Sequence, residues 1–258
     1  MATTVKVFQR YINDLREYSL SSNESRFVAK QLLELYSEVL RRGDVTVLEL
    51  GVDKGQSTKV FLNGMAGKPS SHLVSVDIRD CSCISNANNW TFVQKDSADI
   101  HGVINSAPIL KSGIDILYVD SLHTPEHVRR EIYGYFPYLT KGAVIFFDDI
   151  HSDPYMMGQR KDSVHIEIAN REIFELIEAV FRANRNTLNM IEYHGSTGLC
   201  RLEKLSEIGQ KLNEPVRIKK RNNKLFWRIV NSITNKKQYH HDINANDSFL
   251  IDVTKYCE

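Results

Sequence analysis

The feature that most constrains the fold of this chain is a regular alternation of short apolar runs with stretches of helical spacing, from residue 45 to residue 202. A strand–helix–strand unit places its two strands parallel, joined by a right-handed crossover. The predicted strands are Val45–Leu50, His72–Asp77, Trp90–Gln94, Ile114–Asp120, Ala143–Phe147, Leu188–Tyr193 and Gly198–Leu202. The sequence therefore predicts an α/β fold with a doubly wound, mostly parallel, seven-stranded sheet covered by helices on both faces.

The segments between and before these strands complete the predicted architecture. Apolar residues at helical spacing predict helices over Gly55–Met65, Pro125 to about Tyr138, and Ile168–Ala183. The last two strands are separated only by a turn, so we expect them to pair antiparallel. We divide the chain into N-terminal helices over residues 1–43, an α/β core over 44–203 and a C-terminal extension over 204–258.

Composition narrows the class of protein without naming a partner. The formal net charge is +1, and the 42% hydrophobic and 25% charged residues are ordinary for a globular protein. We expect neither a secretory signal nor a membrane span, and interpret the four cysteines as reduced thiols, which predicts a cytoplasmic location.

The C-terminal extension contains the one strongly biased segment. Residues 216–239 carry eight Lys and Arg and no acid. A helix that packs on the core or on a second copy of the chain, with its charges in water, is one interpretation. A patch for an anionic partner such as nucleic acid is the other.

Polar residues follow each predicted parallel strand, and ligands of open α/β sheets bind at these carboxyl ends. After the first strand, Gly51 and Gly55 allow a tight turn into a helix whose N-terminal amides favour an anionic group. Asp77 ends the second strand, and an acid at this place can bind both ribose hydroxyls of a nucleoside. Asp96 and Ser97 follow the third strand beside the same crevice. A simpler interpretation is that Asp77 and Asp96 each cap a loop.

The fourth and fifth strands are very apolar and end abruptly in acids, Asp120 and the pair Asp148-Asp149. Buried strands that deliver several carboxylates to one edge are costly unless the acids are paired or bind a cation. Oxygen ligands of this kind suit Mg²⁺, Ca²⁺ or Mn²⁺. His123, three residues after Asp120, is the candidate base, and His151 is a second candidate ligand or base.

Two further features near these strand ends have simpler structural interpretations. His127 falls in the first turn of a predicted helix, where the dipole disfavours its charge, and we expect it at the surface. The connection Ser152–Ser163 lacks clear periodicity and is either a lid over a substrate or a wandering loop.

Taken in order, these motifs resemble the class I S-adenosylmethionine (SAM)-dependent methyltransferases. Within them they are most similar to the metal-dependent sugar O-methyltransferases of bacterial polysaccharide and macrolide pathways. The resemblance rests on E-x-G-x-x-x-G-x-S at residues 49–57, the acid Asp77, the Asp96-Ser97 turn, D-x-x-H at residues 120–123, and Asp148-Asp149. It spans about residues 45–150. The chain departs from the pattern at Lys95, where glycine is common, and at Ser121-Leu122.

The resemblance implies a role for each matching residue. The residues implied to bind SAM are Glu49, Gly51, Val52, Gly55, Ser57, Asp77, Asp96, Ser97 and Asp120. Asp120, Asp148 and Asp149 are implied to hold a divalent metal, expected to be Mg²⁺, and His123 is the implied catalytic base. The implied acceptor is a hydroxyl of a small molecule, expected to be a saccharide, and a homodimer is the expected assembly.

Three other functions fit the same sequence. A catechol-like small-molecule acceptor would use the same acids. An RNA methyltransferase is favoured only by the basic extension, and no N-P-P-Y-like tetrad accompanies it. A relative that keeps the fold but has a different function is the third, because a fold does not determine function.

Overall fold

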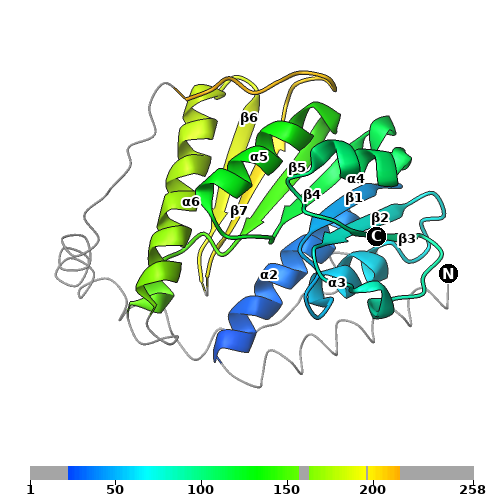
Figure 1. The fold of residues 1–258 in the computed structure, drawn as a ribbon, viewed down its shortest axis with the longest axis horizontal. Helices are drawn as coiled ribbons and strands as arrows, with labels where there is room; N and C mark the ends of the chain where they lie inside the picture. Colours follow the sequence, from blue (N-terminus) through cyan, green and yellow to red (C-terminus); the bar gives the residue numbers. More distant parts are fainter. Residues whose placement is uncertain (1–22, 157–162, 196, 216–258) are drawn as a thin grey trace.

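The computed structural model describes residues 23–156, 163–195 and 197–215. It contains one seven-stranded sheet in the order β3-β2-β1-β4-β5-β7-β6 (Figure 1). The strands are β1 (Thr46–Leu50), β2 (His72–Asp77), β3 (Trp90–Gln94), β4 (Ile114–Val119), β5 (Leu139–Asp148), β6 (Leu188–Tyr193) and β7 (Leu199–Lys204). The first five strands pair in parallel, and β7 pairs antiparallel with both β5 and β6. The predicted fold class is confirmed, as is the antiparallel closing pair.

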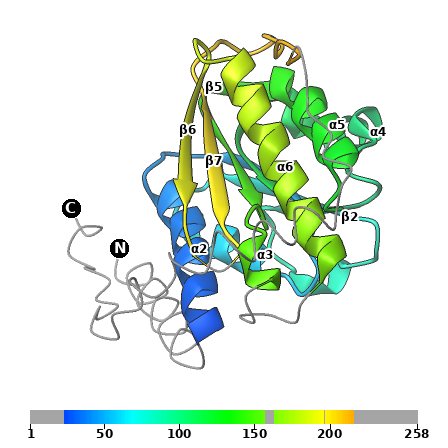
Figure 2. The same cartoon turned by 90° about the vertical axis from the view of Figure 1, so that its left-hand side faces the viewer.

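Helices cover both faces of the sheet (Figure 2). They are α2 (Asn23–Leu40), α3 (Gln56–Gly64), α4 (Ile100–Ser106), α5 (Pro125–Tyr135) and α6 (Val164–Ala183), with short 3₁₀ turns at Ser82–Ile84, Pro108–Ser112, Phe136–Tyr138 and Asp153–Tyr155. Helices α2 and α3 contribute to one apolar cluster, and α4, α5 and α6 contribute to the other. The sheet is therefore buried between two helical layers.

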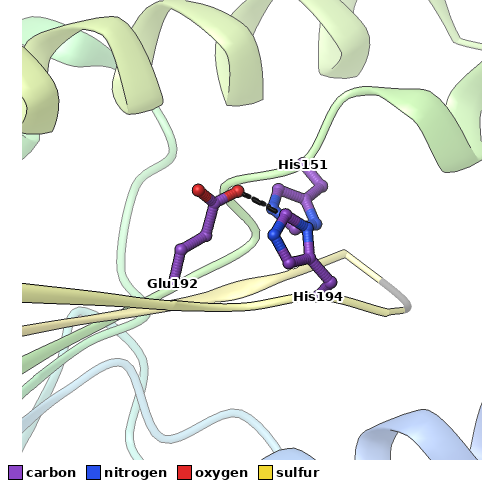
Figure 3. Close-up of side chains that lie close together, drawn as sticks. All are labelled: His151, Glu192 and His194. Atoms are coloured by element: carbon purple, nitrogen blue, oxygen red, sulfur yellow. Dashed lines mark hydrogen bonds and ion pairs between the residues drawn. The ribbon is translucent and has the colours of Figure 1, made fainter.

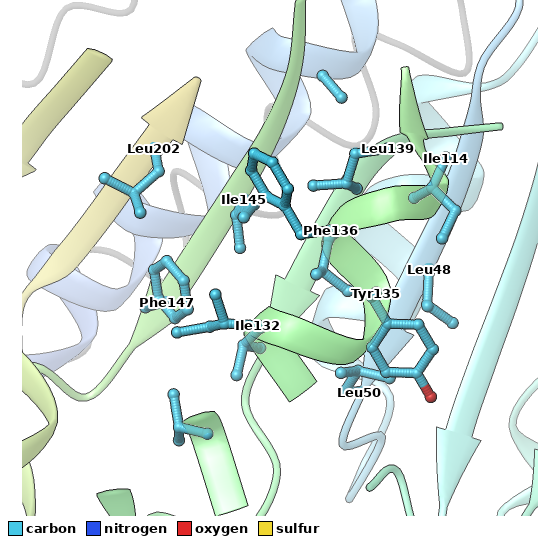
Figure 4. Packing of buried hydrophobic residues seen from close by; sticks show 14 of the residues in the cluster. Leu48, Leu50, Ile114, Ile132, Tyr135, Phe136, Leu139, Ile145, Phe147 and Leu202 are labelled. Atoms are coloured by element: carbon cyan, nitrogen blue, oxygen red, sulfur yellow. The ribbon is translucent and has the colours of Figure 1, made fainter. Parts of the chain in front are cut away.

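The central strands supply both layers through the alternation of their side chains. On β1, Leu48 and Leu50 belong to the cluster beneath α4, α5 and α6, whereas Val47 faces α2 and α3. Figure 4 shows the first of these clusters, in which Ile132 and Tyr135 of α5 pack over the sheet. Strands that are apolar on both faces are the expected pattern for a parallel sheet between helices.

The structure contains one helix that was not predicted, and two elements begin earlier than the sequence predicts. Helix α4 was not predicted, and its N-cap Asp99 accepts a hydrogen bond of 3.0 Å from the Gly102 amide. Helix α6 begins at Val164, four residues before the predicted start, because the Ser163 side chain caps it. Strand β5 begins at Leu139 rather than at Ala143.

The terminal segments are only partly described. Residues 1–22 of the predicted N-terminal helices, residues 157–162 of the predicted lid and the whole basic segment 216–239 lie outside the described residues. In the described part of the chain, no helix combines the length and apolarity needed to cross a membrane. Cys81, Cys83 and Cys200 carry free thiols, and Cys257 lies outside the described residues.

Candidate functional site

The site lies where the strand order reverses, between β1 and β4, at the carboxyl ends of both strands. A cavity of about 530 Å³ opens there. Its lining comes from the ends of β1, β2, β3 and β4 and from α5: Gly51, Val52, Asp53, Val76, Asp77, Ile78, Arg79, Lys95, Asp96, Ser97, Asp120, Ser121, Leu122 and His127. This volume is in the range of small-molecule sites, and the position is the usual one for a ligand of an open α/β sheet.

The loop after β1 forms one wall of the cavity and depends on Gly51. The φ angle of Gly51 is +94°, a conformation that residues with a side chain rarely adopt. A Cβ atom at this position would lie 1.9 Å from the backbone oxygen of Asp120. Glycine is therefore required here both by the turn and by the close approach of the first loop to the end of β4.

Asp77 at the end of β2 holds this loop in place. Its Oδ2 accepts hydrogen bonds from the amides of Val52 (2.9 Å) and Asp53 (3.2 Å). Its Oδ1 accepts a bond of 2.8 Å from the Arg79 amide. Burial alone would raise the pKa of Asp77, but the three amide bonds hold it below its ordinary value. The side chain is thus a carboxylate fixed at the cavity edge.

Glu49 and Ser57 lie beneath the loop instead of lining the cavity. Glu49 is fully buried and accepts hydrogen bonds from the hydroxyls of Ser57 (2.5 Å), Thr58 (2.8 Å) and Ser75 (2.5 Å). Burial raises the pKa of Glu49 to about 7, although the three hydroxyl bonds oppose the rise. The arrangement ties β1, β2 and the first turn of α3 together. Direct contact of either residue with SAM stays a prediction.

The opposite wall joins β3 to α5 and includes a polar cluster that sequence reasoning missed. The prediction that His127 lies at the surface is wrong: its side chain is 13% exposed, and its Nε2 lies 2.9 Å from Ser97 Oγ and 3.2 Å from Glu131 Oε1. Ser121 donates a bond of 2.6 Å to the same Glu131 oxygen. Burial and these hydrogen-bond partners outweigh the unfavourable interaction of a charged histidine with the helix dipole in the first turn. Asp96 is half-exposed, with an oxygen 3.8 Å from His127 Nε2.

The ends of β4 and β5 place an acid–histidine cluster, made of Asp120, Asp148, Asp149 and His123, beside the cavity. Asp120 belongs to this cluster and also lines the cavity. The Tyr118 hydroxyl lies 2.7 Å from Asp148 Oδ2 and 3.2 Å from Asp120 Oδ2. Burial, with the nearby charges of Asp120 and Asp149, raises the pKa of Asp148 to about 8. The pKa of Asp120 is raised as well, first by burial. The predicted convergence of these acids is confirmed for Asp120 and Asp148, which share one hydroxyl.

His123 faces Asp120, with Nε2 3.2 Å from Oδ1. Burial would lower the pKa of His123, but the bond to Asp120 and the charges of Asp149 and Asp148 raise it to about 9. The imidazole therefore holds a proton at neutral pH in this arrangement.

The three carboxylates expected to bind a metal suit a hard cation in kind. All their donors are oxygen. Burial, together with the neighbouring acids, raises the pKa values of Asp120 and Asp148, and a bound dication would oppose this rise. Asp149 adopts a φ of +54°, a strained conformation of the type that gathers at functional sites. Among the described residues, however, these three acids do not all have ligand atoms within 4.8 Å of one another. Metal binding by all three therefore requires a side-chain rotation.

His151 turns away from this cluster toward β6. Its Nε2 lies 2.7 Å from Glu192 Oε1, and His194 lies next to both (Figure 3). Sequence reasoning did not single out Glu192 or His194. The predicted lid begins with the 3₁₀ turn Asp153–Tyr155, and Tyr155 is buried.

Comparison with known proteins places these observations in context. Residues 48–150 match the model of a family described as a methyltransferase domain. A Staphylococcus aureus protein, proposed to be a caffeoyl-CoA O-methyltransferase, has a similar structure at 13% identity with a TM-score of 0.53, covering 76% of this chain and 98% of that one. The fold is therefore the Rossmann-like fold of class I methyltransferases.

Two further relatives are longer than the matched region. The MycE methyltransferase of the mycinamycin biosynthetic pathway, solved with Mg and S-adenosylhomocysteine (SAH), aligns at 18% identity with a TM-score of 0.49, covering 70% of this chain and 50% of MycE. An uncharacterized protein of Acanthamoeba polyphaga mimivirus is 26% identical over 132 residues, which are 46% of this chain and 57% of the viral protein. The chain thus spans only about half the length of these relatives.

Proposed function

We propose that this chain is a SAM-dependent O-methyltransferase that methylates a hydroxyl of a small molecule, with a saccharide as the acceptor class. The observation that carries the proposal is that Asp120 belongs at once to the cavity lining and to the acid–histidine cluster. A cofactor site and a site for activating a hydroxyl are therefore adjacent. The match of residues 48–150 to a methyltransferase domain supports SAM as the cofactor.

The cavity wall has the features that a nucleoside cofactor needs. Oδ2 of Asp77 accepts two backbone bonds, whereas Oδ1 accepts one and keeps a lone-pair direction for a ribose hydroxyl. Gly51 lets the loop backbone approach the ligand closely, and Val52 lines the same wall. Asp96 and Ser97 lie across the cavity, where the adenine end would bind. SAM supplies the electrophilic methyl group.

The acid–histidine cluster is the proposed acceptor site, with His123 as the base. A hydroxyl is a poor nucleophile until its proton is withdrawn, and a positioned histidine accepts such a proton. His123 is protonated while the neighbouring acids are uncompensated, so its action as a base requires that their charge be balanced. Asp120 orients the imidazole through its bond to Nε2.

Asp120, Asp148 and Asp149 are the residues that would hold a divalent metal, with Mg²⁺ favoured by their oxygen donors. When bound, such a cation polarises a hydroxyl oxygen and lowers the pKa of its proton. The same three acids raise the pKa of His123, so a cation that neutralises them favours the neutral imidazole that a base requires. The homodimer and the cytoplasmic location stay predictions.

A turnover assay tests the proposal. The full chain, freed of metal with a chelator, is incubated with methyl-labelled SAM and a panel of saccharides and catechols, with and without Mg²⁺. We expect Mg²⁺-dependent labelling of a saccharide, abolished in Asp148→Asn. Labelling of catechols alone corrects the acceptor class. Labelling that is insensitive to chelation and to the variant contradicts the metal role, and absence of labelling with every acceptor contradicts the proposed function.

A further inference from the structure

We propose that His151, Glu192 and His194 form a binding site for a transition-metal dication of the zinc class. The site is separate from the oxygen cluster of Asp120 and Asp148 and does not depend on the proposed methyl transfer. His151 lies in the loop after β5, Glu192 lies on β6, and His194 follows the end of β6 (Figure 3). Among the described residues, these three are the only trio of His, Cys, Asp or Glu whose ligand atoms lie within 4.8 Å of one another.

The distances are close to those of a metal coordination sphere. His151 Nε2 and His194 Nδ1 lie 2.7 Å and 3.7 Å from the same oxygen, Glu192 Oε1. Zinc bonds to nitrogen and oxygen of about 2.0–2.1 Å in a tetrahedron place neighbouring ligand atoms roughly 3.3 Å apart. The two observed distances bracket that value, and the imidazole nitrogens lie within 4.8 Å of each other. Because the two rings are stacked, a rotation of the exposed His194 side chain would direct its nitrogen at an ion held by His151 and Glu192.

The donor set selects the class of metal. Two imidazole nitrogens and one carboxylate oxygen suit zinc and the neighbouring late transition metals, whereas Mg²⁺ and Ca²⁺ prefer oxygen alone. Three protein ligands leave a fourth tetrahedral position for water or another ligand. Asp120, Asp148 and Asp149, which are proposed to hold Mg²⁺, are all oxygen donors, so the two sites favour different classes of ion.

His151 is held in place by the elements around it. Its amide donates a hydrogen bond of 2.6 Å to the Thr197 oxygen, and its own oxygen accepts one of 3.1 Å from Asn170 of α6. A Cβ on Gly198 would lie 2.4 Å from the imidazole ring, so the ring packs directly on the backbone of the β6–β7 hairpin. The edge-on ring of Phe174, 6.3 Å away, closes another side.

The other two ligands provide access from solvent. The side chains of His151, Glu192 and His194 are 16%, 28% and 77% exposed. The His194 ring stacks on that of His151 with centroids 5.1 Å apart. One ligand is therefore fixed, one is half-buried on the sheet, and the third is exposed and closes on an ion arriving from solvent.

A bound ion would connect the loop after β5 to the β6–β7 hairpin. These two segments flank the end of β5, where Asp148 pairs with Leu199 of β7. The metal would therefore stabilise the sheet edge next to Asp148 and Asp149. The Tm should rise with zinc concentration, because a ligand that binds only the folded state stabilises it by mass action.

The test uses the full chain freed of metal and held in excess Mg²⁺, which occupies oxygen sites. Zinc affinity is measured by competition with a chromophoric chelator, and Co²⁺ is added to read its visible absorption. Glu192→Gln and His194→Ala each remove one ligand. His101→Ala is the matched control, because this exposed histidine of α4 lies outside the trio. The control and the ligand variants all keep His240 and His241, so any zinc binding by that pair is the same in each.

We expect the wild type and His101→Ala to bind one zinc ion at this site with equal affinity and to give the strong absorption of tetrahedral Co²⁺. Each ligand variant should bind zinc more than about tenfold more weakly and lose that absorption, while its circular dichroism is unchanged. Zinc binding to either ligand variant as tight as to the wild type would overturn the proposal. Failure of the wild type to bind zinc would do the same and leave the trio as a hydrogen-bonded cluster.

Discussion

Substitution of Gly51 by alanine tests how the first loop and the end of β4 form the cavity. The added Cβ would lie 1.9 Å from the Asp120 oxygen, and real contacts of this kind start near 3.0 Å, so the two segments must separate by about 1.1 Å. The neighbour is backbone, so no side-chain rotation relieves the overlap. Gly51 and Asp120 both line the cavity, and the displacement therefore changes the binding site itself.

The cost has two parts that a control variant separates. A residue with a side chain in a left-handed conformation loses about 1–2 kcal/mol, and overpacking adds about 1–3 kcal/mol. Gly209 has a similar φ of +85° with nothing within 4 Å of its would-be Cβ. Gly209→Ala should therefore lower the free energy of unfolding by about 1–2 kcal/mol, and Gly51→Ala by about 2–5 kcal/mol.

Urea denaturation measures both free energies, and calorimetry measures SAM affinity. Both displaced segments line the cavity, so we expect Gly51→Ala to bind SAM more weakly than the wild type. Gly209→Ala should bind SAM like the wild type. Equal losses of stability in the two variants, with wild-type SAM affinity in both, would show that the contact between Gly51 and Asp120 does not shape the cavity.

Two further predictions concern buried and catalytic groups. Burial raises the pKa of Glu49 to about 7, so between about pH 4.5 and 7 the folded protein keeps a proton that the unfolded chain has released. The free energy of unfolding of the wild type, measured by urea denaturation, should therefore fall as the pH rises through this window. In Glu49→Gln the fall should be smaller by about 3 kcal/mol. Parallel pH profiles for the two proteins would contradict this prediction. His123→Ala should lower kcat about 10²–10⁴-fold and leave the Kd for SAM unchanged, because His123 does not line the cavity; an equal loss in both quantities would assign it to cofactor binding.

The sheet was predictable because buried parallel strands are continuous apolar runs, and these runs stand out in the sequence. The start of β5 was not. Lys141 is exposed and Gly142 has a φ of +78°, so this pair has the character of a turn, and the register between β4 and β5 shifts at this point. Helix α4 is short and buries only Val103 and Ile104, which is too few apolar positions to produce a helical period.

The strand-end acids were predictable because parallel strands deliver their carboxyl ends to one edge. The partners of His127 were not, because Ser97 comes from a loop of β3 and Glu131 lies a turn further along α5. The contact between His151 and Glu192 joins residues 41 positions apart, from the loop after β5 to β6, and these two strands are not neighbours in the sheet. The periodicity of a single sequence carries no information on such tertiary contacts between side chains.

Calorimetric titration of the full chain with SAM and SAH, repeated with Asp77→Ala, shows directly whether the cavity is a cofactor site. We expect one cofactor per chain in the wild type. We also expect a loss of about tenfold to hundredfold in affinity in the variant, because a carboxylate that bonds the ribose hydroxyls contributes about 1.5–3 kcal/mol. If the wild type binds neither ligand, or if Asp77→Ala binds both as tightly as the wild type, the account of this cavity as a SAM site is wrong.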